Sequence, residues 1–252
     1  MRLLTSFLTA GILFGLIACK DQQHKETADT NQSGEENDWH VLFAGDNTHG
    51  WRGVESDTFP AKGWKLENGL LTGAGEGGDI ISAEQYGDFE LEWDWKMLTP
   101  GGNSGVKYFV REYSTDGKKQ WLGLEYQILD DENFSWMKDG RMKPGDFRTL
   151  AALYEIYPAG NKTARPVGQW NTSRIVAQGR HTEHWLNGQM VLQYERGSDD
   201  FREKVRQSKF APYENFGEHD KGHILIQDHG SEMVFRNIRI RELSATTTHA
   251  GR

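Results

Sequence analysis

Glu125 and Gln127 are the residues of this sequence whose types and spacing most directly suggest chemistry. They lie two positions apart in residues 124–129, a short apolar and aromatic stretch whose alternation predicts a β-strand. Side chains two apart on a strand stand side by side on one face. A carboxylate and an amide are therefore expected on one sheet surface, with Glu125 as an acid or base. The alternative is the ordinary solvated face of an antiparallel sheet.

His229 is the second candidate acid or base. It follows Asp228 at the end of a predicted strand, and an imidazole titrates near neutral pH. The alternative is a turn histidine that caps the sheet.

Two cationic residues are predicted to lie beside Glu125. Lys107 and Arg111 belong to a predicted strand over residues 106–112, where alternation places both on one face with Phe109. A cation there would stabilise a negative oxygen that develops during a reaction. The alternative is a pair of charges on a wet sheet face.

Polar and aromatic residues near these candidates suit a sugar. Asn103 and Gln127 are predicted to hold sugar hydroxyls, and Trp121 and Trp136 to stack on a sugar ring. Burial of the two tryptophans in the core or on the surface is the open alternative.

A divalent cation is a further prediction. Asp130 and Asp131 follow the strand of Glu125 and, with His229, offer ligands to calcium, magnesium or manganese, which prefer oxygen-rich sites. The sequence holds no tight ligand motif such as two histidines at helical spacing.

These residues lie on a predicted all-β domain. The clearest strand is 88–96, where Phe89, Leu91, Trp93 and Trp95 alternate with charged residues, so the aromatic side chains are expected to face the core. Further strands are predicted at residues 40–43, 63–73 (a hairpin with Asn68-Gly69 at its turn), 80–82, 170–178, 181–186, 189–194, 222–228 and 232–242. Residues 130–164 are expected to be a long loop with a helical turn near 150–154, and 201–216 to contain a short helix. Many short strands without β–α alternation predict a sandwich.

The composition excludes some classes of partner. The 252 residues carry a formal net charge of −8, and no basic patch or stripe appears, so no nucleic-acid partner is expected. The nine tryptophans and eight tyrosines fit a β core and sugar stacking.

The N-terminus has the pattern of an export signal. Residues 1–18 combine Arg2 with an apolar core that is too short for a stable membrane span. The segment ends in Leu16-Ile-Ala-Cys19, which resembles a bacterial lipobox, and Cys19 is the chain's single cysteine. The sequence therefore predicts a lipid on Cys19, a flexible tether over 19–38, one domain over 39–244 and a disordered tail over 245–252. Because Lys20 follows the cysteine, the outer membrane of a two-membrane bacterium is the expected location.

An ordered set of short motifs resembles one known family. These are residues 64–73, 88–91, Gly102-Asn-Ser-Gly-Val106, Glu125-Tyr-Gln-Ile-Leu-Asp130, Gly168-Gln-Trp-Asn-Thr172, Trp185-Leu-Asn-Gly188, Leu225-Ile-Gln-Asp-His-Gly230 and Val234-Phe-Arg-Asn-Ile238. Together they resemble the 3-keto-disaccharide hydrolase domain family. The resemblance implies a concanavalin A-like jelly roll of two curved antiparallel sheets. It also implies an exported enzyme that cleaves glycosides oxidised at C3.

The chemistry of such a substrate sets what a site must contain. A ketone at C3 acidifies the C2 hydrogen, so a base can remove it and the C1 substituent can leave by elimination, after which water adds back. This needs a base, an acid for the leaving oxygen and a group that holds the enolate oxygen. Glu125, His229 and Lys107 are the expected catalytic residues. A non-catalytic lectin-like module and a conventional glycosidase on unoxidised sugars are the alternatives.

Overall fold

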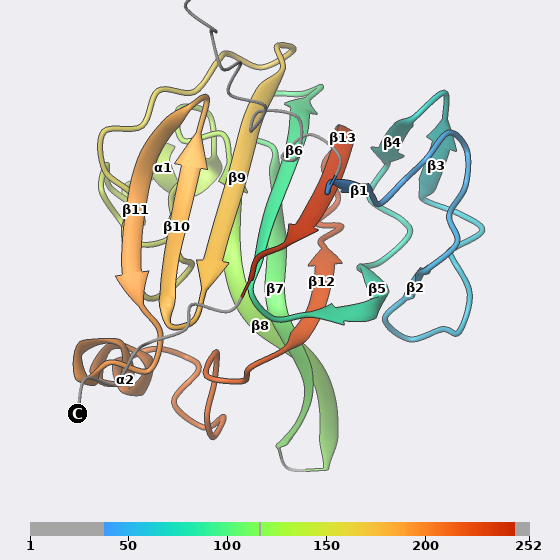
Figure 1. Cartoon of the computed structure of the whole chain (residues 1–252). Helices are drawn as coiled ribbons and strands as arrows, with labels where there is room; N and C mark the ends of the chain where they lie inside the picture. The colour runs from blue at the N-terminus through green and yellow to red at the C-terminus, as the bar shows by residue number, and fades with distance from the viewer. Residues whose placement is uncertain (1–37, 116, 245–252) are drawn as a thin grey trace, which may run out of the picture. The chain divides into compact units, whose positions relative to one another are not determined.

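The computed structural model describes residues 38–115 and 117–244, and nearly all of its regular structure is β-strand (Figure 1). The strands are β1 His40–Val41, β2 Trp51–Gly53, β3 Trp64–Glu67, β4 Leu70–Gly73, β5 Ile80–Tyr86, β6 Phe89–Met97, β7 Asn103–Thr115, β8 Lys118–Leu129, β9 Asn171–Gln178, β10 His181–Leu186, β11 Gln189–Glu195, β12 Gly222–Ile226 and β13 Met233–Glu242. The two helices are α1 Ser135–Lys138 and α2 Asp199–Gln207. The prediction of a helical turn near residues 150–154 is wrong, because this stretch forms non-helical turns.

The strands form two antiparallel sheets. An eight-stranded sheet runs β11-β10-β9-β6-β13-β4-β3, with β1 paired to β13, and a five-stranded sheet runs β2-β5-β12-β7-β8. Figure 1 shows the β7–β8 hairpin extending well beyond the sandwich. The all-β jelly-roll prediction is confirmed.

The core lies between the sheets and follows the predicted alternation. On β6, Phe89, Leu91, Trp93 and Trp95 are each at most 2% exposed. On β8 of the opposite sheet, Leu124, Tyr126 and Ile128 are fully buried, and the Trp93 and Tyr126 rings meet edge to face with centroids 5.1 Å apart. Because β8 buries these three residues, Glu125 and Gln127 must project from the outer face of its sheet.

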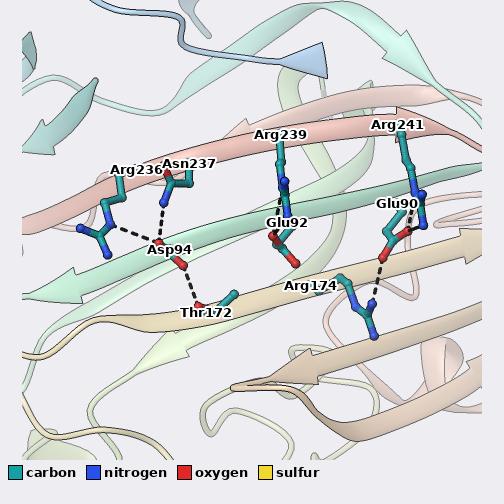
Figure 2. A network of polar contacts seen from close by, with 9 residues as sticks. All are labelled: Glu90, Glu92, Asp94, Thr172, Arg174, Arg236, Asn237, Arg239 and Arg241. Atoms are coloured by element: carbon teal, nitrogen blue, oxygen red, sulfur yellow. Dashed lines mark hydrogen bonds and ion pairs between the residues drawn. The ribbon is translucent and has the colours of Figure 1, made fainter. Parts of the chain in front are cut away.

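The outer face of the eight-stranded sheet carries a ladder of charges (Figure 2). The acids that alternate with the core residues of β6 pair with arginines on β13: Arg239 lies 2.6 Å from Glu92, and Arg241 lies 2.6 Å from Glu90. Arg174 on β9 also reaches Glu90, at 3.0 Å. Such cross-strand pairs satisfy the charges that the predicted alternation turns outward.

Four sequence predictions fall outside the described residues: the export signal over 1–18, the lipid on Cys19, the flexible tether over 19–38 except for its last residue, and the disordered tail over 245–252. Within the described part of the chain, no helix has the length and apolar character needed to cross a membrane.

Candidate active site

Three neighbouring strands position the candidate side chains on the outer face of the five-stranded sheet. The register pairs Lys107 of β7 with Glu125 of β8, and Gly105 with Gln127. On the other side of β7, Leu225 of β12 pairs with Lys107. Directly paired residues share a face, so Lys107, Glu125 and Gln127 stand together as predicted.

A cleft of about 440 Å³ lies over this face. It is lined by Asn103, Lys107, Gln120, Leu122, Gly123, Glu125, Gln127, Tyr154, Lys209, Phe210, Tyr213, Gln227 and His229. The structure thus brings together five of the predicted site residues, and His229 is an exposed member of the set.

Glu125 is the buried titratable group of the cleft, with 7% of its surface exposed. Burial raises the pKa of its carboxyl, and the nearby charge of Asp79 adds to this, while Lys107, Lys209 and His229 act in the opposite direction. Lys107 is itself 3.8 Å from Asp79. A carboxylate with a raised pKa binds a proton more tightly than an ordinary glutamate does, which makes Glu125 a suitable general base.

A loop closes one side of the cleft by hydrogen-bonding to the edge of β8. Tyr154 N donates to Glu125 O at 3.0 Å, and Ala151 N donates to Gln127 O at 2.8 Å. From the opposite sheet, His184 Nδ1 lies 2.9 Å from Ala151 O, and burial lowers the pKa of His184 to about 4. A neutral imidazole in the core therefore donates to the loop that carries Tyr154 into the cleft.

Eight lining residues were not among the predicted site residues, and three of them, Gln227, Lys209 and Tyr154, act on Glu125 through a hydrogen bond or a charge. Gln227 lies in the quoted Leu225–Gly230 motif, next to Asp228 and His229, so its position was a usable signal. Lys209 follows α2, with its Nζ 4.4 Å from the centroid of the Tyr154 ring. Lys209 and Tyr154 come from a predicted helical segment and a predicted loop, and no local pattern marks them.

Arg111 does not share the face of Lys107, and this prediction is wrong. A bulge shifts the β7–β8 register between Tyr108 and Arg111, so that Arg111 pairs with Leu122. Phe109 has φ 51° within this bulge and is fully buried in the core. The extra residue reverses the alternation beyond it, and Arg111 Nε instead donates to Lys221 O at 3.0 Å.

The two predicted stacking residues lie outside the cleft. Trp121 packs on the small outer cluster of Ile81, Val110 and Leu225, and the Arg52 guanidinium lies 5.1 Å from its ring centroid. Trp136, on α1, has the guanidinium of Arg141 at 5.1 Å and that of Arg148 at 5.7 Å from its ring centroid. An arginine guanidinium therefore lies near each of the two indole rings on which a sugar was predicted to stack.

Asp130 and Asp131 also lie apart from His229, in a second cleft of about 400 Å³. Asp130 accepts hydrogen bonds from Gly101 N at 2.8 Å and from Asn133 Nδ2 at 2.9 Å. Asp131 accepts from Leu150 N and pairs with Lys162 at 2.7 Å. Within the described ranges, no group of three His, Cys, Asp or Glu side chains is placed to hold a metal ion. The predicted ligand set is therefore not assembled.

Comparison with known proteins places the chain in a family. Residues 38–241 match the family described as the 3-keto-alpha-glucoside-1,2-lyase-like domain. The chain is 34% identical over 230 residues to the 3-keto-disaccharide hydrolase of Bacteroides thetaiotaomicron, covering 81% of this chain and 78% of that protein.

Two solved structures from Parabacteroides distasonis, both named as glycosyl hydrolases, are also similar. One is 31% identical with a TM-score of 0.71, covering 82% of this chain and 94% of the other. The second is 30% identical with a TM-score of 0.61, covering 82% of this chain and 100% of the other. The sequence match across the whole described domain and the shared fold agree, and the chain belongs to the 3-keto-alpha-glucoside-1,2-lyase-like family.

Proposed function

We propose that this protein cleaves glycosides whose sugar ring carries a ketone at C3, in the cleft above Glu125 and Lys107. Its family and its relatives support a glycosidase-like hydrolase. The observation that carries the finer proposal is the buried Glu125, whose carboxyl has a raised pKa, standing directly across from Lys107.

Each step of the elimination has a group in the cleft. Glu125 removes the C2 proton, and the electron pair of the C2–H bond moves toward the C3 carbonyl, where Lys107 stabilises the enolate oxygen. The enolate then expels the C1 substituent, whose oxygen takes a proton from His229. Water adds to C1 of the resulting enone while C2 regains a proton, so the net result is hydrolysis. If the enone were released before water adds to it, the same site would act as a lyase.

The cleft favours this reaction over the two alternatives. A conventional glycosidase uses two carboxylates that flank the scissile bond, whereas Glu125 is the single carboxylate among the described residues that line this cleft. A lectin has no need of a buried carboxyl whose pKa is raised, and such groups are concentrated at catalytic sites.

The test is a matched pair of substrates, a 3-keto-glycoside and its unoxidised parent, given to the purified domain with and without a chelator. We expect turnover of the keto form and little of the parent, because only the ketone acidifies C2–H. Equal rates on both would refute the proposal. A divalent cation stays a prediction, and loss of activity in the chelator arm, restored by added metal, would support it.

Replacing His229 by Ala should lower turnover by about 10–10²-fold, below the usual 10²–10⁴-fold for proton transfer, because water reaches this exposed position. If His229 protonates the leaving oxygen, the loss is larger for a poor alkyl leaving group than for a nitrophenyl one. His223→Ala is the control, because the His223 ring is hydrogen-bonded through Nδ1 to Ser82 O and does not line the cleft. The same loss with both leaving groups would exclude His229 as the acid.

We also propose that the protein is exported and held on the outer membrane by a lipid on Cys19. The lipobox and the polar segment after it support this. Cys19→Ser should move the protein from the membrane fraction to the soluble fraction and remove the mass of the lipid from the N-terminal peptide. Soluble wild-type protein with an unmodified Cys19 would contradict the proposal.

A further inference from the structure

Gln227 is held in the cleft by three separate contacts. Its backbone N donates to Gly105 O at 2.9 Å, and its carbonyl accepts from Ser104 Oγ at 2.9 Å. Its side chain is 4% exposed, and Nε2 donates to Glu125 Oε2 at 3.2 Å. Within the described ranges, Gln227 is the one side chain that hydrogen-bonds the Glu125 carboxylate.

Gly105 provides the space for this amide. A Cβ added at Gly105 would overlap Gln227 Oε1, and that oxygen is buried without a hydrogen-bond partner in the described part of the chain. Any other residue at position 105 would therefore push the amide away from its place beside Glu125. A glycine is needed here for the close approach of a side chain.

From this arrangement we infer that Gln227 is a positioning residue that fixes the Glu125 carboxylate and lowers its proton affinity. The missing side chain at Gly105 leaves the space that the Gln227 amide needs for this role. The inference concerns the base assigned under the proposed function and rests on that assignment. A hydrogen bond donated to a carboxylate favours its charged form, so it opposes the effect of burial and keeps Glu125 available as a base. It also turns one carboxylate oxygen toward Gln227, which leaves the other for the substrate.

The nearby Gln127 supplies a matched control. It is also 4% exposed and lines the same cleft, but its Nε2 donates to Arg148 O at 3.2 Å instead of to Glu125. Loss of the Gln127 amide should therefore leave the pKa of Glu125 unchanged, whatever it does to substrate binding.

The experiment measures the pKa of Glu125 by NMR, from the side-chain carboxyl of glutamate-labelled protein without substrate, with Glu125→Gln assigning the signal. Gln227→Met keeps the length of the side chain and removes the hydrogen-bond donor. It should raise the titration midpoint of Glu125 by roughly one pH unit. Gly105→Ala should raise it in the same direction, and Gln227→Glu further, because a like charge disfavours ionisation. Amide spectra that match the wild type show that each variant is folded.

Activity separates this inference from the proposed function. On a 3-keto-glycoside, the acid limb of the pH profile of kcat/KM should shift to higher pH in Gln227→Met and Gly105→Ala. It should stay at the wild-type pH in Gln127→Met. An unchanged Glu125 midpoint in folded Gln227→Met, or an equal shift in Gln127→Met, overturns the inference. A shifted midpoint in a protein that does not cleave keto substrates would support the role of Gln227 while rejecting the proposed function.

Discussion

Glu125→Gln lowers turnover on 3-keto-glycosides by about 10²–10⁴-fold, the range over which a positioned general base acts. Glutamine keeps the shape of the side chain but cannot take the C2 proton. Because the loss is in proton transfer, we expect kcat to fall much more than KM changes. The measurement is steady-state turnover of the keto substrate by variant and wild type.

The same change should leave the fold intact. Burial raises the pKa of Glu125, so its ionisation destabilises the native state, and the stability present at low pH is lost as the pH rises through the folded pKa. Glutamine removes this cost, and the melting temperature at neutral pH should be equal or higher. Glu112→Gln is the matched control, because Glu112 lies on the same hairpin, pairs with Lys119 and does not line the cleft. Full activity of Glu125→Gln would remove this residue as the base.

The raised pKa also predicts the pH profile of the wild-type enzyme. The base acts only when it is ionised, so the rate should fall as the pH decreases through the folded pKa. This acid limb should lie above the ordinary glutamate value of about 4.3 and should be absent from the residual activity of Glu125→Gln. A limb at the ordinary value would contradict a raised pKa of the base.

Trp93→Ala should destabilise the domain by about 3–5 kcal/mol, the range for removal of a large buried aromatic side chain. Trp93 is 1% exposed and packs edge to face on Tyr126, so the substitution leaves a cavity between the sheets. For a domain of this size, the melting temperature should fall by about 6–20 °C.

Leu98→Ala is the control for this substitution, because Leu98 follows the same strand and is 42% exposed. Its effect should stay within about 0.5 kcal/mol. Denaturant unfolding of the wild type and the two variants gives the free energies of unfolding to compare. A decrease below about 1 kcal/mol in Trp93→Ala would mean that the Trp93 ring is not packed in the core.

The parts of the site that could be predicted are those fixed by local alternation. The period-two pattern of β8 places Leu124, Tyr126 and Ile128 inside, and this alone puts Glu125 and Gln127 outside. The position of Lys107 opposite Glu125 follows once β7 and β8 form a hairpin.

The remaining parts depend on features that alternation does not encode. Phe109 takes a left-handed backbone conformation without being a glycine, and the resulting bulge sends Arg111 to the other face. Lys209 and Tyr154 reach the cleft from segments outside its strands, through contacts that exist only in the folded chain. The aspartates after β8 were predicted as metal ligands from their type alone, whereas in the fold their oxygens serve backbone amides and Lys162.

The most direct test of the central claim is whether the C2 hydrogen of the sugar leaves during cleavage. The 3-keto-glycoside is turned over in D₂O, and the 3-keto sugar product is analysed by mass spectrometry at early times, against authentic product incubated in the same buffer with the enzyme omitted. Elimination through Glu125 predicts deuterium at C2 in the enzymatic product beyond this background, and slower turnover of substrate deuterated at C2. Cleavage with the original C2 hydrogen retained and no isotope effect would contradict the account.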